Sequence, residues 1–262
     1  IKVMENYELL LEVASLAGEI MLKNGAETYR VEDTINRILK MSNLETVASF
    51  VVTTGIVASL SGKDAPTLTV VKRVNSRSNH LAKVCDVNEI SRKFCSGMIT
   101  LEEAYAKLNE IDKRTQYPDW LKNICYVVVA VFFTIMLGGR MKDSIISCMN
   151  GIILATLLYI GDKIKSTEFL MDVFISMVVA IMTIIYSKIL HIAINIDIVI
   201  IGSIMALFPG VALTNAIRDT LSGDYASGGA RMLEAIVKAI GIGLGVGAGI
   251  GFMQLCIGGV LL

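Results

Sequence analysis

The chain has 262 residues, of which 54% are hydrophobic and only 18% are charged, and its mean hydropathy is +0.64. This composition excludes an ordinary water-soluble globular protein. Lys and Arg together number 24, as do Asp and Glu, so the excess of basic residues that marks a nucleic-acid-binding protein is missing and no nucleic-acid partner is expected.

Charge divides the chain into two parts. Up to Asp119 there are 15 Lys/Arg and 16 Asp/Glu, whereas the longer remainder from Trp120 has 9 and 8. We therefore expect an α+β cytoplasmic domain over residues 1–118, followed by an all-α polytopic membrane domain over 119–262 with about five transmembrane helices. The first segment is amphipathic and charged, unlike a signal peptide.

The first domain is predicted to combine helices with a small sheet. Apolar residues recur at helical spacing from Tyr7 to Lys23, and a second helix is expected over 27–41. Segments rich in Val, Ile and Thr then predict an antiparallel meander of strands over 46–53, 55–61 and 67–74. Two further helices are expected over 81–95 and from Thr100, which forms a capping box with Glu103, to Asp112.

Five apolar runs in the second domain are long enough, or nearly so, to cross a bilayer as helices. They cover residues 120–137, 144–160, 169–186, 194–208 and 235–262. An odd number of spans places the termini on opposite sides, and Lys and Arg are more numerous in the flanks on the N-terminal side. We expect a multi-pass protein of the plasma (inner) membrane with its N-terminal domain in the cytoplasm.

A polar segment over residues 209–234 separates the last two apolar runs. It contains two arginines, three carboxylates and several hydroxyl and amide side chains. Lipid cannot hydrogen-bond such groups, so near a bilayer they are tolerated mainly where they face protein or water. The segment is our first candidate for a solute site, either at the cytoplasmic mouth or in a re-entrant position.

The last apolar run has glycine at every second position from Gly241 to Gly251. On a helix these glycines form two G-x-x-x-G tracks, 241/245/249 and 243/247/251, which lie about 200° apart. We expect both sides of this helix to accept a close neighbour. Small residues used only for static packing are the alternative interpretation.

Two stretches far apart in the chain resemble motifs of the threonine/serine exporter family. In the polar segment they are Pro209-Gly210, Leu213 to Asp219, Gly223-Asp224, Ser227-Gly228, Ala230-Arg231 and Glu234-Ala235. Near the N-terminus, Asn24 to Glu32 is similar to the family's first motif, and Thr53 to Ile56 and Lys72 to Val74 follow in the expected order. The resemblance covers nearly the whole chain.

The resemblance implies a secondary transporter, and we expect no cofactor or metal. It would export small polar solutes, threonine and serine first, and be driven by the proton gradient. Some relatives are similar to dicarboxylate (succinate) exporters, which gives the alternative substrate. Long family members carry a second membrane block, so the resemblance also implies a second small membrane subunit, and a homo-oligomer is the other assembly that we expect.

A zwitterionic solute needs a cation for its carboxylate, an anion for its ammonium and a partner for its hydroxyl. We expect Arg218 or Arg231 to bind the carboxylate, Asp219 or Asp224 to bind the ammonium or the coupling proton, and Asn215 or Ser227 to bind the hydroxyl. The helix N-terminus near Pro209 would add free N–H groups for an anion. The full predicted site is Thr214, Asn215, Arg218, Asp219, Asp224, Ser227, Arg231 and Glu234, with a helix break at Pro209 and Gly210.

Spacing on a helix adds detail and an alternative. If the polar segment is helical, Thr214 and Arg218 share one face, and Asn215 and Asp219 share another. A purely structural interpretation makes Arg231 and Glu234 a local ion pair. In the N-terminal motif, the expected functional residues are Gly25, Glu27, Arg30 and Glu32. Either they stabilise a helix start, or Glu27 or Arg30 forms a gating contact with the cytoplasmic mouth.

Other functions have little support in the sequence. The five cysteines are scattered and show no metal-type spacing with His80 or His191, so neither a disulfide framework nor a zinc site is predicted. We find no G-x-S-x-G motif and no nucleotide-binding glycine loop, so an enzyme is not expected. A passive channel with a regulatory N-terminal domain remains the alternative.

Overall fold

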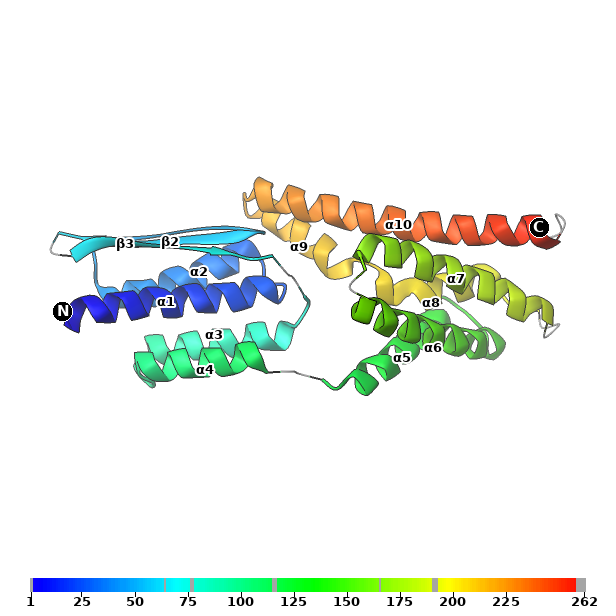
Figure 1. Cartoon of the computed structure of the whole chain (residues 1–262), viewed down its shortest axis with the longest axis horizontal. Coiled ribbons are helices and arrows are strands. Elements are labelled where there is room, and N and C mark those ends of the chain that lie inside the picture. Colours follow the sequence, from blue (N-terminus) through cyan, green and yellow to red (C-terminus); the bar gives the residue numbers. More distant parts are fainter. Residues whose placement is uncertain are drawn as a thin grey trace. The chain divides into compact units, whose positions relative to one another are not determined.

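A computed structural model describes residues 2–63, 65–75, 78–114, 117–164, 166–189 and 193–257 (Figure 1). His191 and the last residues of the fifth predicted run lie outside the described residues. The chain forms two compact units. Unit 1 combines Ile1–Arg114 with Gly210–Glu234, and unit 2 combines Thr115–Pro209 with Ala235–Leu262.

Unit 1 contains the predicted helices and sheet in three layers. The strands pair antiparallel in the order β1-β2-β3, and Figure 1 shows α1 and α2 between this sheet and the pair α3 and α4. The elements are α1 (Lys2–Lys23), α2 (Thr28–Leu39), η1 (Lys40–Ser42), β1 (Thr46–Val52), β2 (Gly55–Gly62), β3 (Ala65–Arg73), α3 (Leu81–Cys95) and α4 (Leu101–Lys113). The meander and the four helices are thus confirmed, with ends shifted by a few residues.

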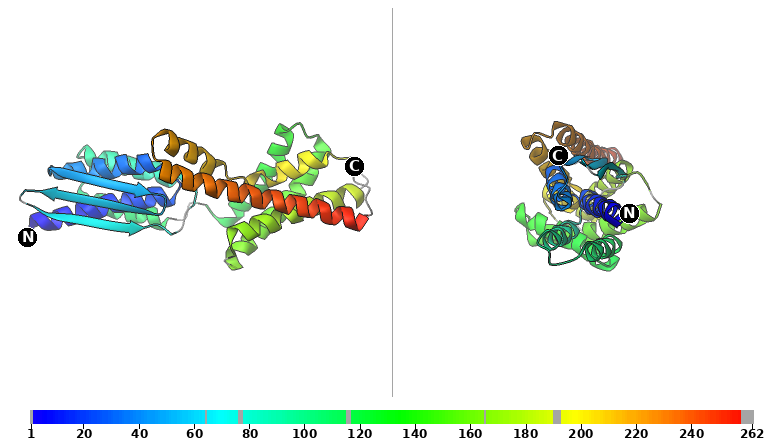
Figure 2. Two further views of the ribbon diagram at one scale, coloured as in Figure 1. Left: turned by 90° about the horizontal axis from the view of Figure 1, so that it is seen from above. Right: turned by 90° about the vertical axis from the view of Figure 1, so that its left-hand side faces the viewer.

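The core of unit 1 fills the space between the sheet and α1 and α2. Ile20, Ile35, Ile56 and Leu60 are fully buried there, and Figure 2 shows that the helices cover one face of the sheet. Gly18 lets α1 and α2 approach closely, because a Cβ at this position would lie 2.5 Å from Cδ1 of Ile35. The packing of these apolar side chains is what stabilises the two helices on the sheet.

Capping interactions fix the start of α4 in unit 1. Thr100 Oγ1 accepts a hydrogen bond from the N–H of Glu103, and the N–H of Thr100 donates to the Glu103 carboxylate. The predicted capping box is therefore confirmed. It satisfies two backbone N–H groups, one at the N-cap and one in the first turn of the helix, that have no partner within the helix.

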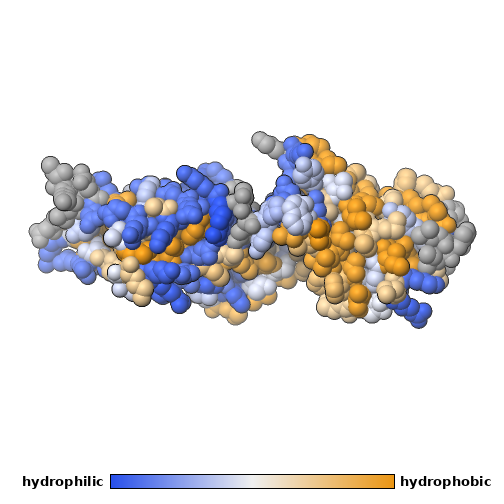
Figure 3. All heavy atoms as spheres, turned by 90° about the horizontal axis from the view of Figure 1, so that it is seen from below, coloured by the Kyte–Doolittle hydropathy of each residue, from blue (hydrophilic) through white to orange (hydrophobic). Residues whose placement is uncertain are grey.

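Unit 2 is built from apolar helices. These are α5 (Asp119–Met136), α6 (Met141–Ile164), α7 (Glu168–Ile189), α8 (Ile196–Ile204), η2 (Met205–Leu207) and the larger part of α10 (Tyr225–Ile257). Among the described residues, four helices are long and apolar enough to cross a membrane, or five if Ile196–Leu207 and Gly210–Leu221, which are separated by a bend, count as one span. Figure 3 shows apolar side chains over much of the surface of these helices.

The last helix starts earlier than its apolar pattern indicates. It begins at Tyr225 and not at Ala235, because Asp224 caps its first turn by accepting the N–H of Ser227 at 3.0 Å. A polar first section hides such a helix from a search for apolar runs. The N-cap aspartate is the sequence signal that would have shown it.

The two glycine tracks of α10 have different surroundings. At Gly245 a Cβ would overlap the Val173 carbonyl and the Ser176 hydroxyl of α7, and at Gly249 it would lie 2.7 Å from the Met177 carbonyl. At Gly243, Gly247 and Gly251 it would meet no described atom within 4 Å. One track therefore allows α7 to pack against the backbone of α10, and the other has no close neighbour within the described part of the chain.

Candidate functional site

The polar segment forms a helical hairpin in unit 1. Its first arm is α9 (Gly210–Leu221), its second arm is the start of α10, and Gly223 makes the turn between them with a φ of 90°. The helix expected near Pro209 is therefore present. The chain breaks between Leu207, the end of η2, and Gly210, at the position of the predicted helix break.

The two predicted faces of α9 have different environments. Asn215 and Asp219 are buried, and the side chain of Asp219 is 0% exposed. Thr214 and Arg218 are exposed, and the Thr214 hydroxyl donates to the Gly210 carbonyl of its own helix. The buried face of α9 is therefore polar, and its side chains need partners elsewhere in unit 1.

Those partners belong to the turn between α1 and α2, residues 25–28. Gly25 has a φ of 89°, a conformation that glycine adopts without strain, and its carbonyl accepts a hydrogen bond from Asn215 Nδ2 at 2.8 Å. The Ala26 carbonyl accepts one from Arg231 Nη2 at 2.8 Å. The N-terminal motif and the motif of the polar segment, almost 200 positions apart in the sequence, are therefore in direct contact.

Asp219 provides an N-terminal cap for α2 from a distant part of the chain. Glu27 occupies the N-cap position, but its side chain makes no capping hydrogen bond. Instead, Asp219 Oδ1 accepts the N–H of Thr28 at 3.1 Å, and Asp224 Oδ2 accepts the Thr28 hydroxyl at 2.9 Å. Carboxylates are favoured at a helix start, where backbone N–H groups are unpaired and the helix dipole is positive.

Arginines balance the negative charge of these carboxylates. Arg231 Nε lies 3.1 Å from Asp219 Oδ2, and both side chains are buried. Glu27, whose side chain is only 6% exposed, contacts Arg218 Nη1 at 2.5 Å and Arg30 Nη1 at 3.3 Å. Together the set contains three guanidinium groups and three carboxylates. We call these six side chains, with Asn215 and Thr28, the helix-start cluster.

Hydrogen bonding sets the protonation of two of these acids. Burial disfavours the charged form of Glu27, but its backbone hydrogen bond and the guanidinium groups of Arg218 and Arg30 outweigh this and hold its pKa below the usual value. Burial acts in the same way on Asp224, and hydrogen bonds from Ser227 and Thr28 hold its pKa below the usual value. Both groups are therefore carboxylates at neutral pH.

The other predicted site residues lie outside this cluster or at its margin. Glu32 accepts the N–H of Val51 at 2.9 Å, which attaches α2 to β1. Ser227 is buried in the first turn of α10, and its backbone N–H donates a hydrogen bond to the Asp224 carboxylate. Glu234 is exposed further along α10. The contacts of Glu32 and of the Ser227 backbone are therefore structural ones within unit 1.

Unit 2 contains buried polar groups that reasoning from the sequence missed. The amide of Asn150 donates to the hydroxyls of Thr183 at 2.8 Å and Ser203 at 3.3 Å, and the hydroxyls of Thr134 and Ser147 lie 2.6 Å apart. These contacts join α5, α6, α7 and α8. A second group is the buried carboxylate of Asp172 in α7. A polar residue inside an apolar run was the available signal.

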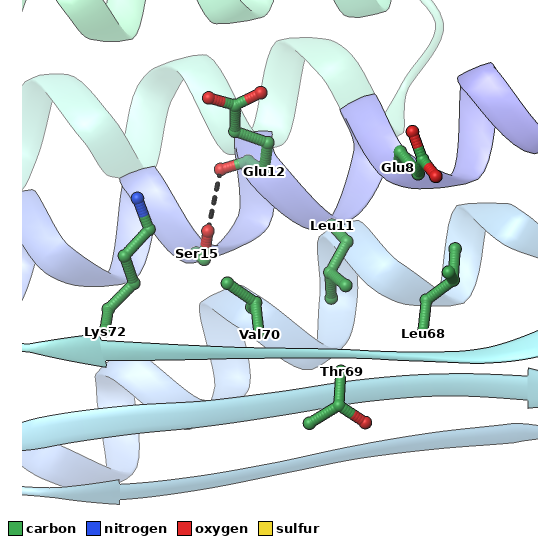
Figure 4. A pocket seen from close by; sticks show the side chains of 8 residues that line it. All are labelled: Glu8, Leu11, Glu12, Ser15, Leu68, Thr69, Val70 and Lys72. Atoms are coloured by element: carbon green, nitrogen blue, oxygen red, sulfur yellow. Dashed lines mark hydrogen bonds between the residues drawn. The ribbon is translucent and has the colours of Figure 1, made fainter.

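A shallow hollow on unit 1 contains none of the motif residues. Figure 4 shows it between α1 and β3, with Glu8, Glu12 and Lys72 around apolar side chains. Within the described ranges, no group of three His, Cys, Asp or Glu side chains is placed to hold a metal ion. Neither the hollow nor a metal site offers an alternative to the helix-start cluster within the described part of unit 1.

The apolar helices of unit 2 and the α+β-like N-terminal part define a multi-pass membrane protein. A family model described as "Putative threonine/serine exporter" matches residues 12–253. The chain belongs to this threonine/serine exporter family.

Two longer proteins are similar to the chain. It is 22% identical over 235 residues to a "Probable threonine/serine exporter" of Mycobacterium tuberculosis, an alignment that covers 89% of this chain and 44% of that protein. It is also 22% identical over 238 residues to an uncharacterized protein of Schizosaccharomyces pombe, covering 88% and 29%. The chain thus spans less than half of either relative. No solved structure matches the chain.

Proposed function

We propose that this chain is a membrane transporter subunit that exports small polar solutes, threonine and serine first, out of the cytoplasm and in exchange for protons. The observation that carries the proposal is the family match over residues 12–253, which includes both units and both motifs. In this proposal unit 1 lies in the cytoplasm, and the apolar helices of unit 2 cross the plasma (inner) membrane.

The charge balance of the helix-start cluster supports a zwitterionic solute. Its three arginines face three carboxylates, so it has no excess of positive charge for a dianion. Arg218 is its most open arginine, with a side chain that is 57% exposed, and its partner is Glu27. A zwitterion can replace both contacts of this ion pair, because its carboxylate can bind Arg218 and its ammonium can bind Glu27. Succinate, the alternative substrate, has no ammonium group to replace Arg218 beside Glu27, so only Arg30 would then pair with this carboxylate.

A second polypeptide is part of the proposal. The two relatives are more than twice as long as the region that matches. The proposal includes a second small membrane subunit, as the family resemblance implies, or another copy of this chain. The transport experiment therefore compares the chain alone with the chain and the second subunit together.

Efflux from cells loaded with a threonine-containing dipeptide tests the proposal. Cells expressing the chain with the second small membrane subunit are expected to release threonine, and an uncoupler is expected to stop the release. Arg218→Gln and Glu27→Gln should reduce it, because each removes one of the two charges that would bind the zwitterion. Arg37→Gln is the matched control, since Arg37 forms an exposed pair with Asp33. Expression of the chain alone shows whether the subunit is required.

The same cells separate the alternatives. Release of succinate without threonine would assign the chain to dicarboxylate export. Threonine release that follows the solute gradient and ignores the uncoupler would identify a channel. If neither solute leaves the cells with any subunit combination, the export proposal fails.

A further inference from the structure

Asp172 is a buried acid within a helix that is apolar enough to cross a membrane. It lies in the second turn of α7 and is 5% exposed. Among the described residues, no donor makes a hydrogen bond to its Oδ2 atom. An ionised carboxylate in such a position costs much free energy, and ionisable groups inside membrane segments usually serve transport.

The surroundings of Asp172 contain one cation and a competing acid. Lys238 of α10 lies 3.1 Å from Glu168, which precedes Asp172 by one turn of α7 and has a side chain that is 77% exposed. Within the described ranges, Lys238 and Glu168 are the charged side chains that influence Asp172. The Ser176 hydroxyl, one turn further on, donates to the backbone carbonyl of Asp172 at 2.7 Å.

Close packing of the two helices keeps this cation near the buried acid. The glycine track of α10 places Gly241 against Phe169 and Val173, and Gly245 against Val173 and Ser176. These α7 residues flank Asp172 along the helix. Because Lys238 precedes Gly241 by three positions on α10, it lies on the turn next to this contact.

Two other buried acids have partners for both of their oxygens, through hydrogen bonds or an ion pair. Asp143 accepts the N–H of Arg140 at 2.7 Å with one oxygen and the N–H of Asn195 at 2.8 Å with the other. Asp219 accepts the N–H of Thr28 and faces Arg231. Asp172 differs from both, because it is buried in an apolar helix and its Oδ2 atom has neither a hydrogen-bond donor nor a cation within 4.0 Å in the described part of the chain.

We propose that Asp172 is the site at which the exporter binds its coupling proton, and that Lys238 moves between Glu168 and Asp172 as the proton leaves and returns. This inference rests on the proposed function. Binding forms one O–H bond on the carboxylate and gives a neutral acid, for which Lys238 stays with Glu168. Release breaks that bond, and the new charge attracts Lys238 to the buried position. No electron transfer is involved.

Transport by the purified chain, reconstituted with the subunit if export requires it, tests this assignment. Threonine uptake into liposomes is measured once with an imposed pH gradient and once as exchange against internal threonine without a gradient. Asp172→Asn should remove the gradient-driven uptake and retain exchange, because its amide cannot release a proton. Asp197→Asn is the matched control, an exposed acid in the first turn of α8. Gradient-driven uptake by Asp172→Asn equal to wild type would overturn the inference.

A spectroscopic measurement decides the point even if threonine is not the substrate. Infrared difference spectra between about pH 5 and pH 8 report the C=O band of protonated carboxyl groups. Asp172→Asn should lose a component of this band that wild type and Asp197→Asn both show. Identical spectra for wild type and Asp172→Asn would exclude a titrating proton at Asp172, whereas absent threonine transport with the band present would reject only the substrate.

Discussion

The pair Asp219–Arg231 illustrates how buried charges hold the hairpin on unit 1. Each side chain is at most 6% exposed, so removal of one leaves the other charge buried without its partner. We expect Arg231→Met to destabilise the protein by about 3–5 kcal/mol. Thermal unfolding of the purified protein in detergent measures this effect.

The control for this prediction is an exposed pair of the same residue types. Arg37→Met breaks the contact of Arg37 with Asp33 at 2.7 Å on the surface of α2, and should cost less than about 1 kcal/mol. The double variant Asp219→Leu/Arg231→Met is expected to recover part of the loss, since neither charge of this pair is then left without its partner. Equal shifts for Arg231→Met and Arg37→Met would contradict the role of burial.

Glu27 gives the helix-start cluster a defined dependence on pH. Its pKa is lower in the folded protein than the value of about 4.3 expected in an unfolded chain. A depressed folded pKa adds stability that is present above the unfolded value and is lost as the pH falls through the folded value. Glu27→Gln should therefore lower the stability at pH 7, and its difference from wild type should shrink below about pH 4.

Unfolding of wild type and Glu27→Gln across this pH range checks the prediction. Glu45→Gln serves as control, because Glu45 and its partner Lys63 are both largely exposed. If the difference in stability between wild type and Glu27→Gln is constant from pH 7 to about pH 3, the charge of Glu27 does not contribute to the stability of the protein.

At this scale the sequence predicted the right neighbours on α9 but not their partners. Helical spacing placed Asn215 and Asp219 on one face, and both are buried there. Spacing describes residues within one or two turns, whereas Thr28 contacts Asp219 from 191 positions away. The family resemblance named both motifs without indicating that they touch.

At the scale of helices, the glycines of α10 provide a matched comparison. Gly245→Ala would place a methyl group on the Val173 carbonyl of α7, whereas the same change at Gly247 meets no described atom within 4 Å. We expect Gly245→Ala to cost about 1–3 kcal/mol through overpacking. Gly247→Ala should be neutral or stabilising by up to about 1 kcal/mol, because alanine favours a helix.

Thermal unfolding in detergent compares these two variants. They differ only in which side of α10 receives the methyl group, so composition and helix propensity change equally. If both lose the same stability, close packing of α7 on the glycine track does not distinguish the two sides.

Elements with a regular pattern were predictable, and the polar hairpin was less so. The meander, α3 and the capping box of α4 follow from alternation, helical spacing and the pair Thr100–Glu103. The start of α10 at Tyr225 did not follow, because its first turns are polar and resemble a loop. Asp172 was missed for the opposite reason, since fifteen of the 18 residues in its predicted run, 169–186, are apolar.

At the scale of the whole molecule, composition separates polar from apolar residues but not one packed unit from another. The predicted boundary near residue 118 remains a prediction, whereas packing groups residues 210–234 with the first 114. A segment that returns to an earlier unit leaves no signal in local composition. Only its polar, strongly charged character between two apolar runs indicated that it has protein partners.

The distant cap on α2 has a consequence for synthesis of the chain. Thr28 leaves the ribosome 191 residues before Asp219, which at 5–20 residues per second is a delay of about 10–40 s. During that time α5 to α8 are made, while the first turn of α2 has no carboxylate from α9 to accept its N–H. Unit 1 therefore reaches its final structure only after translation has passed Arg231. By that time α5 to α8 have already been synthesised, so the N-terminal unit completes its folding after these membrane helices are made.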